Sequence, residues 1–348
     1  MYIHYVTSYR DNARDLSTIQ GLREAGVHVT ETELTDTGWK KYQQLSRALR
    51  YDTHNPAWII VGYTGVLFVP FVRLISRTPI VYNALASFYE GMIISRQHGQ
   101  WFSLSSLRYW ITDTVAFHAA TYILVESEAQ RAFIHRVFFV PLRKLIVHYT
   151  SLDERSFFPD PAVVKHSQFA VVFRGKFLPE AGVETLIAAA PALARADIRI
   201  EIYGHGMLEK KVRELVAASP AKNILLVTDF LPIDHLRNAM LKCHLSIGQL
   251  AQHPRLTRTI PHKAFESAVL KLPYLTGRNG AVLELFTEDV TCLCCIPGDP
   301  HDLAEKIIAA KNNPEHLAAI SESAYTLYTN TFSAKVLGKK LLIQLTFA

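Results

Sequence analysis

The side chains that could do chemistry gather in one stretch, residues 250–285. Arg258 lies in a polar loop, and Lys263 and Glu266 follow on an expected helix, because Pro261 suits a first helical turn and apolar residues then recur on one face. Arg and Lys donate to phosphate oxygens, helix N-termini offer amide donors, and a carboxylate can accept both hydroxyls of a ribose. The pattern predicts recognition of a nucleotide diphosphate. An ordinary amphipathic helix with a solvated charged face is the alternative.

The elements around these residues place them at the edge of a sheet. Residues 274–276 predict a short buried strand, and residues 281–286 predict a further helix with Glu284 in its first turn. Loop, helix, strand, loop and helix in this order bring the charged side chains to strand and helix ends. Open α/β sheets bind their ligands at such ends.

Composition limits the class of protein. A chain of 348 residues is long enough for two domains, each with its own core, and 49% hydrophobic with 20% charged residues is typical of globular proteins. The net charge of +6 fits anionic substrates or a membrane surface. Lys and Arg are scattered along the chain, which argues against a nucleic-acid partner.

The cysteines and the hydrophobic segments indicate a cytoplasmic protein. Three of the four cysteines lie in TCLCCIPGD, an expected buried strand, and no second pair stands at the spacing of zinc ligands. Core thiols in a reducing compartment are the interpretation we favour. Residues 2–7 read as a strand and not as a signal peptide, and residues 58–75 contain glycines, a proline and an arginine that favour a strand, a turn and a helix over a membrane span.

Strands and helices alternate along the whole chain. The expected strands are 2–7, 27–30, 58–61, 79–83, 121–125, 145–149, 169–173, 198–203, 224–227, 245–247 and 274–276. The expected helices are 15–24, 39–49, 107–120, 128–138, 182–193, 207–218, 233–241 and 333–345, with a polar loop at 8–12 and a linker at 151–161. This order predicts an α/β fold with two doubly wound, Rossmann-like sheets facing across a cleft. We expect domains at 1–160 and 161–332, with residues 333–348 packing back on the first.

The order of several segments resembles the GT-B nucleotide-sugar glycosyltransferases, in particular the family-4 retaining enzymes. FRGKFLPEAGVETLIAAAPAL is similar to the opening of their donor domain, and EIYGHGMLE to the strand and glycine turn that follow. RTIPHKAFESAVLKLPYLT resembles a subgroup pattern, Arg-x-Ile-Pro-x-Lys followed by Glu on a helix. VTCLCCIPGDPHDLAEKI is similar to the strand, Pro-Gly-Asp turn and late helix. YNALASFYEGMIISR resembles a strand-end loop that faces the cleft.

The resemblance implies transfer of a sugar from a nucleotide-diphosphate sugar to a hydroxyl acceptor, which is a glycan, a lipid-linked molecule or a small molecule. It implies a donor site made of Arg174, Gly175, Lys176, Gly204, Gly206, Arg258, Lys263, Glu266 and Glu284. On the acceptor side it implies Asn83, Ser87 and Tyr89. Retention and a reaction without a metal or other cofactor are expected, because no Asp-x-Asp is present to hold a metal–diphosphate complex. No catalytic residue is identified, and His205, Asp113 and His118 are expected to be structural.

Two positions depart from the family pattern. The first of two glutamates falls at Arg258, and the lysine of a phosphate-binding Lys-Gly pair falls at Ala181. Arg174 and Lys176 could supply the lost charge. A catalytically degenerate subunit that binds or scaffolds is therefore the alternative function. An epimerase of the same fold also stays open, whereas a dehydrogenase is disfavoured because no G-x-G-x-x-G follows the first strand.

Aromatic and basic residues in the first half admit two interpretations. Trp58, Phe68, Phe71, Arg73 and Arg77 fit peripheral contact with a membrane that carries a lipid-linked acceptor. Packing between strands and helices explains them as well.

Overall fold

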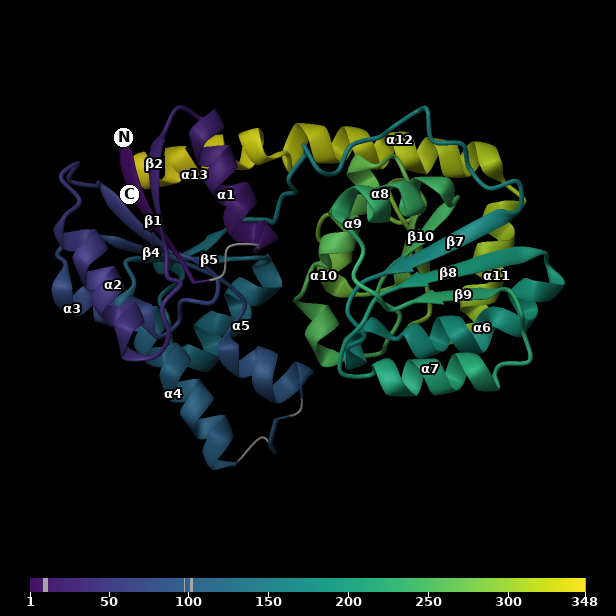
Figure 1. Cartoon of the computed structure of the whole chain (residues 1–348), viewed down its shortest axis with the longest axis horizontal. Coiled ribbons are helices and arrows are strands. Elements are labelled where there is room, and N and C mark those ends of the chain that lie inside the picture. The colour runs from purple at the N-terminus through teal and green to yellow at the C-terminus, as the bar shows by residue number, and fades with distance from the viewer. Residues whose placement is uncertain (9–11, 97, 101–102, 348) are drawn as a thin grey trace. The chain divides into compact units, whose positions relative to one another are not determined.

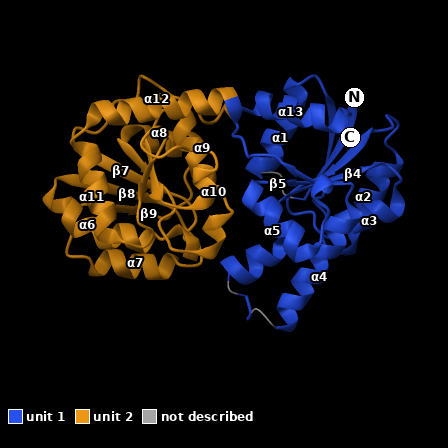
Figure 2. Cartoon of the chain, turned by 180° about the vertical axis from the view of Figure 1, so that it is seen from behind, with its two compact units in different colours: residues 1–153, 331–348 blue, residues 154–330 orange. Residues whose placement is uncertain are grey.

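The computed structural model describes residues 1–8, 12–96, 98–100 and 103–347, so that most of the polar loop expected at 8–12 lies outside it. The chain forms two compact units, one of residues 1–153 with 331–348 and one of residues 154–330 (Figure 2). Each unit contains a six-stranded parallel sheet with helices around it. The predicted α/β class with two Rossmann-like sheets is confirmed.

The first unit is built on a sheet with the strand order β2-β1-β3-β4-β5-β6 (Figure 1). Its strands are β1 (Tyr2–Thr7), β2 (His28–Glu33), β3 (Trp58–Val61), β4 (Ile80–Leu85), β5 (Tyr122–Val125) and β6 (Leu145–Val147). Its helices are α1 (Ala13–Glu24), α2 (Trp39–Arg50), α3 (Phe68–Ile75), α4 (Leu104–Ala119), α5 (Glu128–Phe138) and α13 (Ala334–Thr346), with a π-helical turn at Glu90–Ser95 and a 3-10 turn at Leu142–Lys144.

The second unit has the strand order β12-β11-β10-β7-β8-β9. Its strands are β7 (Phe169–Arg174), β8 (Ile198–Tyr203), β9 (Ile224–Val227), β10 (Leu245–Ile247), β11 (Tyr274–Gly277) and β12 (Leu293–Cys295). Its helices are α6 (Val183–Arg195), α7 (Glu209–Ala218), α8 (Ile233–Lys242), α9 (His262–Val269), α10 (Gly280–Leu283), α11 (Pro300–Lys311) and α12 (Pro314–Thr331), with 3-10 turns at Pro179–Ala181 and Pro254–Thr257.

The central strands are apolar on both faces because helices cover both sides of a parallel sheet. In β7 the run Ala170–Phe173 is fully buried, and the sequence shows it as a continuous apolar segment. All four cysteines are buried with free thiols, which confirms that they are core residues. Among the described residues, none of the helices combines the length and the apolar character needed to cross a bilayer.

The last helix, α13, lies against α1 in the first unit, so that both ends of the chain belong to this unit (Figure 1). The two helices meet at glycines. A Cβ atom on Gly338 would lie 1.9 Å from the carbonyl oxygen of Gly21, and one on Gly21 would lie 2.2 Å from the carbonyl oxygen of Ala334. The helix axes can approach this closely only without side chains at these positions.

We predict that Gly338→Val lowers the free energy of unfolding of the first unit by about 1–3 kcal/mol, because the new side chain forces α13 away from α1. Lys339→Val is the matched control, since it places the same side chain on the exposed face of the helix. Urea titrations followed by circular dichroism measure both. Helix propensity favours valine over glycine, so a Gly338→Val protein that is no less stable than the parent would show that the two helices separate without cost.

Candidate functional site

Predicted site residues of the second unit lie where the strand order of its sheet reverses. The chain adds β8 and β9 on one side of β7 and then returns to place β10 on the other side, so β7 pairs with both β8 and β10. Open α/β sheets bind ligands at the carboxyl ends of strands next to such a switch point. Arg174 ends β7 there, and Gly204 follows the end of β8.

Glycines let the two strand-end loops approach each other. Gly175 and Gly206 both have a φ of +147°, which L-residues rarely adopt, and a Cβ on Gly204 would lie 2.0 Å from the carbonyl oxygen of Gly175. A Cβ on Gly175 would also come within 3.3 Å of the Nζ of Lys263. The backbone of this edge is therefore open to a ligand and close to a cationic group.

A cavity of about 190 Å³ lies at this edge of the sheet. Its lining consists of Arg174, Gly175, Lys176, Tyr203, Gly204, His205, Asp229, Phe230, Leu231 and Leu236. The sequence predicts four of these as donor-site residues and misses the segment after β9. This segment could have been predicted, because it directly follows the expected strand 224–227. The glycine loops follow β7 and β8 in the same way.

Glu266 is the most deeply buried acidic group of the site, with no exposed surface. Its Oε1 lies 3.1 Å from Nη1 of Arg174 and accepts a hydrogen bond of 3.0 Å from Nδ1 of His262. Its Oε2 is buried as well and has no hydrogen-bond partner within the described part of the chain. One carboxylate oxygen is therefore fixed by its neighbours and the other remains available.

The charges around Glu266 keep it ionised. Burial alone would raise the pKa of this carboxyl, but the guanidinium of Arg174 and then the hydrogen bond from His262 outweigh burial and lower the pKa to about 2. The carboxylate is thus an acceptor, and not a donor, at any pH near neutrality.

Lys263 is a buried cation beside this carboxylate. Its side chain is 6% exposed, and its Nζ stands 3.7 Å from the ring centroid of Phe173. Burial, followed by the charge of Arg174, lowers the pKa of Lys263 to about 7, although the charge of Glu266 acts in the opposite direction. An anion placed next to Lys263 would restore its proton.

Comparison with known proteins assigns the family. Residues 155–327, almost the whole second unit, match the family described as glycosyl transferases group 1. The second unit belongs to the group 1 glycosyl transferases. A 2-deoxystreptamine N-acetyl-D-glucosaminyltransferase of Niallia circulans is 24% identical over 180 residues, which are 47% of this chain and 45% of that protein. An uncharacterized glycosyltransferase of Methanocaldococcus jannaschii is 26% identical over 152 residues, 44% of this chain and 41% of that protein. The aligned stretch thus spans less than half of the length of both relatives.

Solved glycosyltransferase structures share the fold of the whole chain. Anabaena HepE, solved in complex with UDP and glucose, superposes with a TM-score of 0.78 at 16% identity and full coverage of both chains. WaaG, a glycosyltransferase involved in lipopolysaccharide biosynthesis, gives a TM-score of 0.70 at 11% identity over 99% of this chain and 100% of its own. The predicted GT-B fold is confirmed, and the second unit matches the predicted glycosyltransferase family. The family-4 retaining subtype stays a prediction.

The two positions that depart from the family pattern have different surroundings in the second unit. Ala181 is 1% exposed and packs in the core, so no side chain at that position reaches a ligand. Arg258 is partly buried, and its Nη1 donates to Oγ1 of Thr257 at 3.3 Å. Lys176 is exposed beside the cavity, where it can approach an anion. Arg174 and Lys176 thus line the cavity and Lys263 lies beside Gly175, while a role of Arg258 in donor binding stays a prediction.

Glu284 does not lie where the sequence places it. The helix α10 begins at Gly280 and ends at Leu283, so Glu284 is its C-terminal cap and not part of its first turn. The helix starts earlier than expected because Asn279 accepts a hydrogen bond from the amide of Val282 and caps it. Glu284 is absent from the lining of the cavity, as are the other predicted donor-site residues Gly206, Arg258, Lys263 and Glu266.

The residues expected on the acceptor side serve the interior of the first unit. Asn83 has no exposed surface: its Oδ1 accepts a 2.6 Å hydrogen bond from Nε of Arg14, and its Nδ2 donates to the hydroxyl of Tyr5 at 2.8 Å. Ser87 is buried and accepts from the amide of Glu90 at 3.0 Å. Because these polar groups already have internal partners, we correct the expectation that Asn83 and Ser87 contact an acceptor.

The other three residues considered in the first unit are Tyr89, Asp113 and His118. Tyr89 is half-buried, and its ring packs edge-on against Phe138. The carboxylate of Asp113 accepts from the amides of Phe88 and Tyr89 at 3.0 and 2.7 Å, and Nε2 of His118 lies 3.0 Å from the carbonyl oxygen of Phe138. Structural roles for Asp113 and His118 are confirmed.

We predict that Gly204→Ala destabilises the second unit by about 1–3 kcal/mol, because the new methyl group overlaps the backbone of Gly175. Gly280→Ala is the matched control: its Cβ would meet no atom closer than 3.7 Å, so its effect should stay within about 0.5 kcal/mol. Chemical unfolding measures the free energy of unfolding of both variants. A Gly204→Ala protein as stable as the parent would mean that the two loops separate without cost.

Proposed function

We propose that this glycosyltransferase moves a sugar from a UDP-linked donor to a hydroxyl acceptor, with retention and without a metal at the diphosphate. Membership in the group 1 family supports sugar transfer. The choice of UDP is supported by Anabaena HepE, which has been solved with UDP and with UDP-glucose. Retention rests on the resemblance to the family-4 enzymes.

The observation that carries this proposal is the buried Oε2 of Glu266, which has no hydrogen-bond partner among the described residues. A buried carboxylate oxygen without a hydrogen-bond donor costs about 1–3 kcal/mol, so the site gains by receiving a donor. The hydroxyls of a ribose are donors of the right kind, and a carboxylate can accept from both. The ion pair with Arg174 holds the carboxylate in place before the nucleotide arrives.

The cationic groups around Glu266 fit the diphosphate. Arg174 and Lys176 line the cavity, and Nζ of Lys263 lies beside the open backbone of Gly175. When the bond between the anomeric carbon and the diphosphate oxygen breaks, negative charge accumulates on the leaving diphosphate. Donors that are already fixed in a partly buried site stabilise this charge without reorganising. In this proposal, cationic side chains stabilise the negative charge of the diphosphate, a role that a metal ion has in other transferases.

We predict a rise in melting temperature with UDP that does not depend on magnesium, and smaller shifts with GDP, ADP and CMP. Glu266→Ala should weaken UDP binding by about 10–100-fold, the equivalent of losing hydrogen bonds to a charged group. Lys176→Ala should weaken it as well. Glu214→Ala, at a side chain that is 65% exposed on α7, is the control and should bind like the parent. If Glu266→Ala and Lys176→Ala both bind UDP as the parent does, the proposed site is wrong.

We also predict that UDP affinity falls as the pH rises above about 7. Lys263 has a pKa of about 7 in the free protein, and a neighbouring diphosphate favours its charged form, so binding takes up a proton once the free lysine is neutral. Calorimetric titrations above about pH 7.5, where the charge of the diphosphate no longer changes, measure this dependence. Lys263→Arg keeps its charge throughout and should bind with the same affinity across the range. A parent protein without pH dependence would contradict a titrating Lys263 at the site.

A catalytically degenerate subunit is the second candidate, and the buried Ala181 favours it, because the family pattern has a phosphate-binding lysine there. Both candidates bind UDP, so binding does not separate them. Release of UDP from UDP-sugars in the presence of candidate acceptors does. An enzyme turns over, whereas the degenerate subunit binds without turnover.

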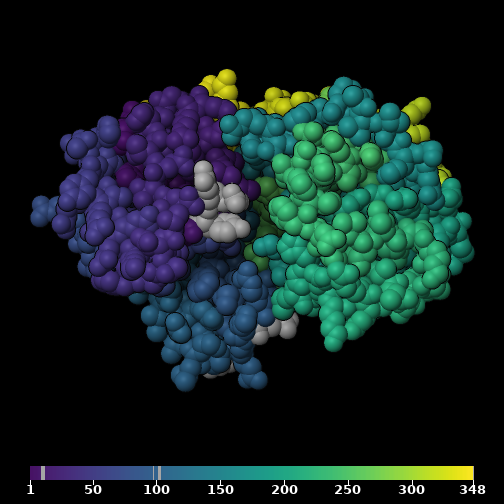
Figure 3. Space-filling model, in the orientation of Figure 1, coloured from purple at the N-terminus to yellow at the C-terminus, as the bar shows by residue number. Residues whose placement is uncertain are grey.

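We further propose that the first unit contacts an anionic membrane. Trp58 and Phe68, which the sequence suggested for this role, are buried in the core. The exposed apolar side chains of the first unit include a stripe on α4, the helix labelled in blue in Figure 1, and Figure 3 gives the space-filling view in the same orientation. The stripe consists of Leu104, Leu107, Ile111 and Val115, which are 87, 52, 47 and 49% exposed. Arg108, also exposed on α4, provides a positive charge beside it.

The membrane proposal is tested by flotation with vesicles that contain phosphatidylglycerol. Replacement of Leu107 and Ile111 together by serine should reduce the vesicle-bound fraction. The control replaces Val164 and Ile343, which are 83 and 57% exposed elsewhere on the surface, by serine. Equal binding of the two double variants would contradict a specific role of α4.

A further inference from the structure

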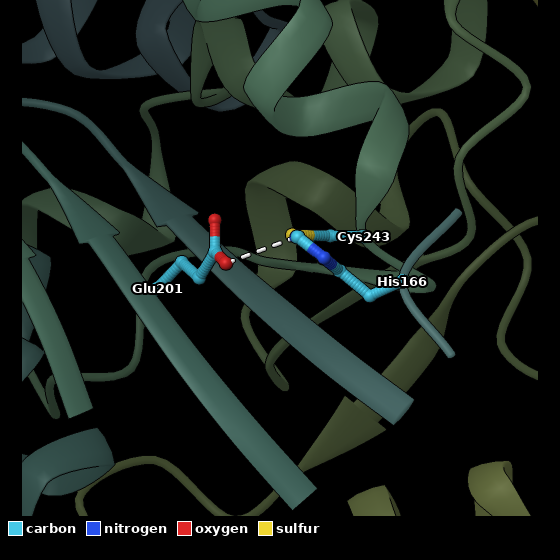
Figure 4. A group of neighbouring side chains, drawn as sticks. All are labelled: His166, Glu201 and Cys243. Carbon is cyan, nitrogen blue, oxygen red and sulfur yellow. Dashed lines mark ion pairs between the residues drawn. The ribbon is translucent and has the colours of Figure 1, made fainter. Parts of the chain in front are cut away.

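A second group of polar side chains lies inside the second unit, away from the Glu266 cluster. Strand β8 carries Glu201 near its end, and the Glu201 side chain is 3% exposed. Cys243 directly follows α8 and is fully buried, and His166 precedes β7. The three side chains come from three separate segments and point toward one another (Figure 4).

The backbone holds these segments together independently of the three side chains. The amide of His166 donates to the carbonyl oxygen of Lys242 at 2.9 Å, and Nζ of Lys165 donates to that of Cys243 at 2.6 Å. The segment before β7 is thus tied to the end of α8. These contacts hold the backbone of His166 and Cys243 close together, so the fold brings both residues to the same side of Glu201.

The spacing of the three ligand atoms suits a metal ion. Nε2 of His166 lies 3.1 Å from Oε1 of Glu201, and all three potential ligand atoms are within 4.8 Å of one another. Ligands of a four-coordinate zinc ion, at bond lengths of about 2.0–2.3 Å, are roughly 3.4–3.8 Å apart. Small side-chain movements would therefore complete the geometry.

We propose that His166, Glu201 and Cys243 bind a zinc ion, with a water molecule as the fourth ligand. Sulfur, imidazole nitrogen and carboxylate oxygen are the three ligand types that zinc accepts. A cavity of about 380 Å³ is lined by His166 and Glu201 and gives the ion and the water a path from solvent. Binding replaces the proton of the Cys243 thiol, which is released to solvent, and the thiolate and the carboxylate together balance the two charges of the ion.

The surroundings of Glu201 define what must change on binding. Nε of Arg199 donates to Oε1 at 2.6 Å, and the ion takes its place; the Arg199 side chain is 39% exposed and can turn to solvent. The hydroxyl of Tyr203 donates to Oε2 at 2.6 Å and can remain as an outer partner that orients the carboxylate. Tyr203 also lines the cavity at the end of β7, so the ion would steady one wall of that cavity.

This inference goes beyond the proposed function, and its test requires neither nucleotide binding nor sugar transfer. The full-length protein is stripped of metal with a chelator and titrated with Co²⁺, a spectroscopic substitute for zinc. We expect a near-ultraviolet band of sulfur-to-cobalt charge transfer together with intense visible bands of four-coordinate cobalt, saturating at one equivalent and bleached by zinc. Absence of the charge-transfer band at saturating Co²⁺ would overturn the proposal.

Variants locate the site. Cys243→Ser should abolish the charge-transfer band, and His166→Gln should weaken cobalt binding by at least about tenfold, the lower end of what even the loss of an outer partner costs. Cys292→Ser is the matched control, a buried thiol on the other side of the sheet order, and should keep both bands. Because His166 is partly exposed, its variant should fold even if Cys243→Ser does not. A band lost in Cys292→Ser but kept in His166→Gln would place the metal at the other cysteines and contradict the assignment.

Discussion

The site of the second unit depends on one ion pair, between the fully buried Glu266 and Arg174, whose side chain is 28% exposed. Loss of Arg174 would leave the buried charge of Glu266 without this compensation. Arg174 lies at the end of β7, while Glu266 and Lys263 come from α9, so the pair joins β7 to α9. Only one of the two carboxylate oxygens of Glu266 takes part in this ion pair. The interaction that stabilises the site thus also leaves it able to accept a ligand.

Close backbone approaches determine what surrounds this pair. Gly204 and Gly175 bring the loops after β8 and β7 into contact, and Gly182, at a φ of +64°, lets the start of α6 pack against the backbone of Ala251, where a Cβ would lie 2.3 Å from its nitrogen. The second of these contacts buries Ala181. A long cationic side chain would have to leave the core at this position, so the tight packing and the missing lysine belong together. The charge of the site is concentrated on Arg174, Lys176 and Lys263 instead.

Much of the fold could be predicted from the sequence because parallel α/β units have strong local signals. The helix Glu128–Phe138 and the strands Ile224–Val227 and Leu245–Ile247 have the bounds that their apolar patterns predict. Arg174, Gly175, Lys176 and Gly204 could be placed at one edge of the sheet for the same reason, since a glycine or a cation directly after a buried strand marks that edge, and their role in donor binding stays a prediction.

The remaining features depend on contacts between distant segments. Asn83 follows a strand core and looks like a ligand-facing amide, but Arg14, 69 positions away, uses it inside the unit. Glu201 alternates with apolar residues in β8, and nothing in this local pattern shows that His166 and Cys243 lie beside it. The spacing of apolar residues usually predicts which face of a helix is buried. On α4, however, four apolar side chains are exposed. Burial and partnership of polar groups are properties of the assembled chain and cannot be read from local pattern.

The central claim is that the free oxygen of Glu266 accepts the hydroxyls of a nucleotide ribose. The most direct measurement compares the affinities of UDP and of 2′,3′-dideoxy-UDP by calorimetry, in the parent protein and in Glu266→Gln. The account predicts that the parent prefers UDP by roughly tenfold or more, the size of one or two hydrogen bonds to a charged group, and that the variant loses most of this preference. A parent protein that binds both nucleotides equally, or a variant that keeps the full preference, would contradict it.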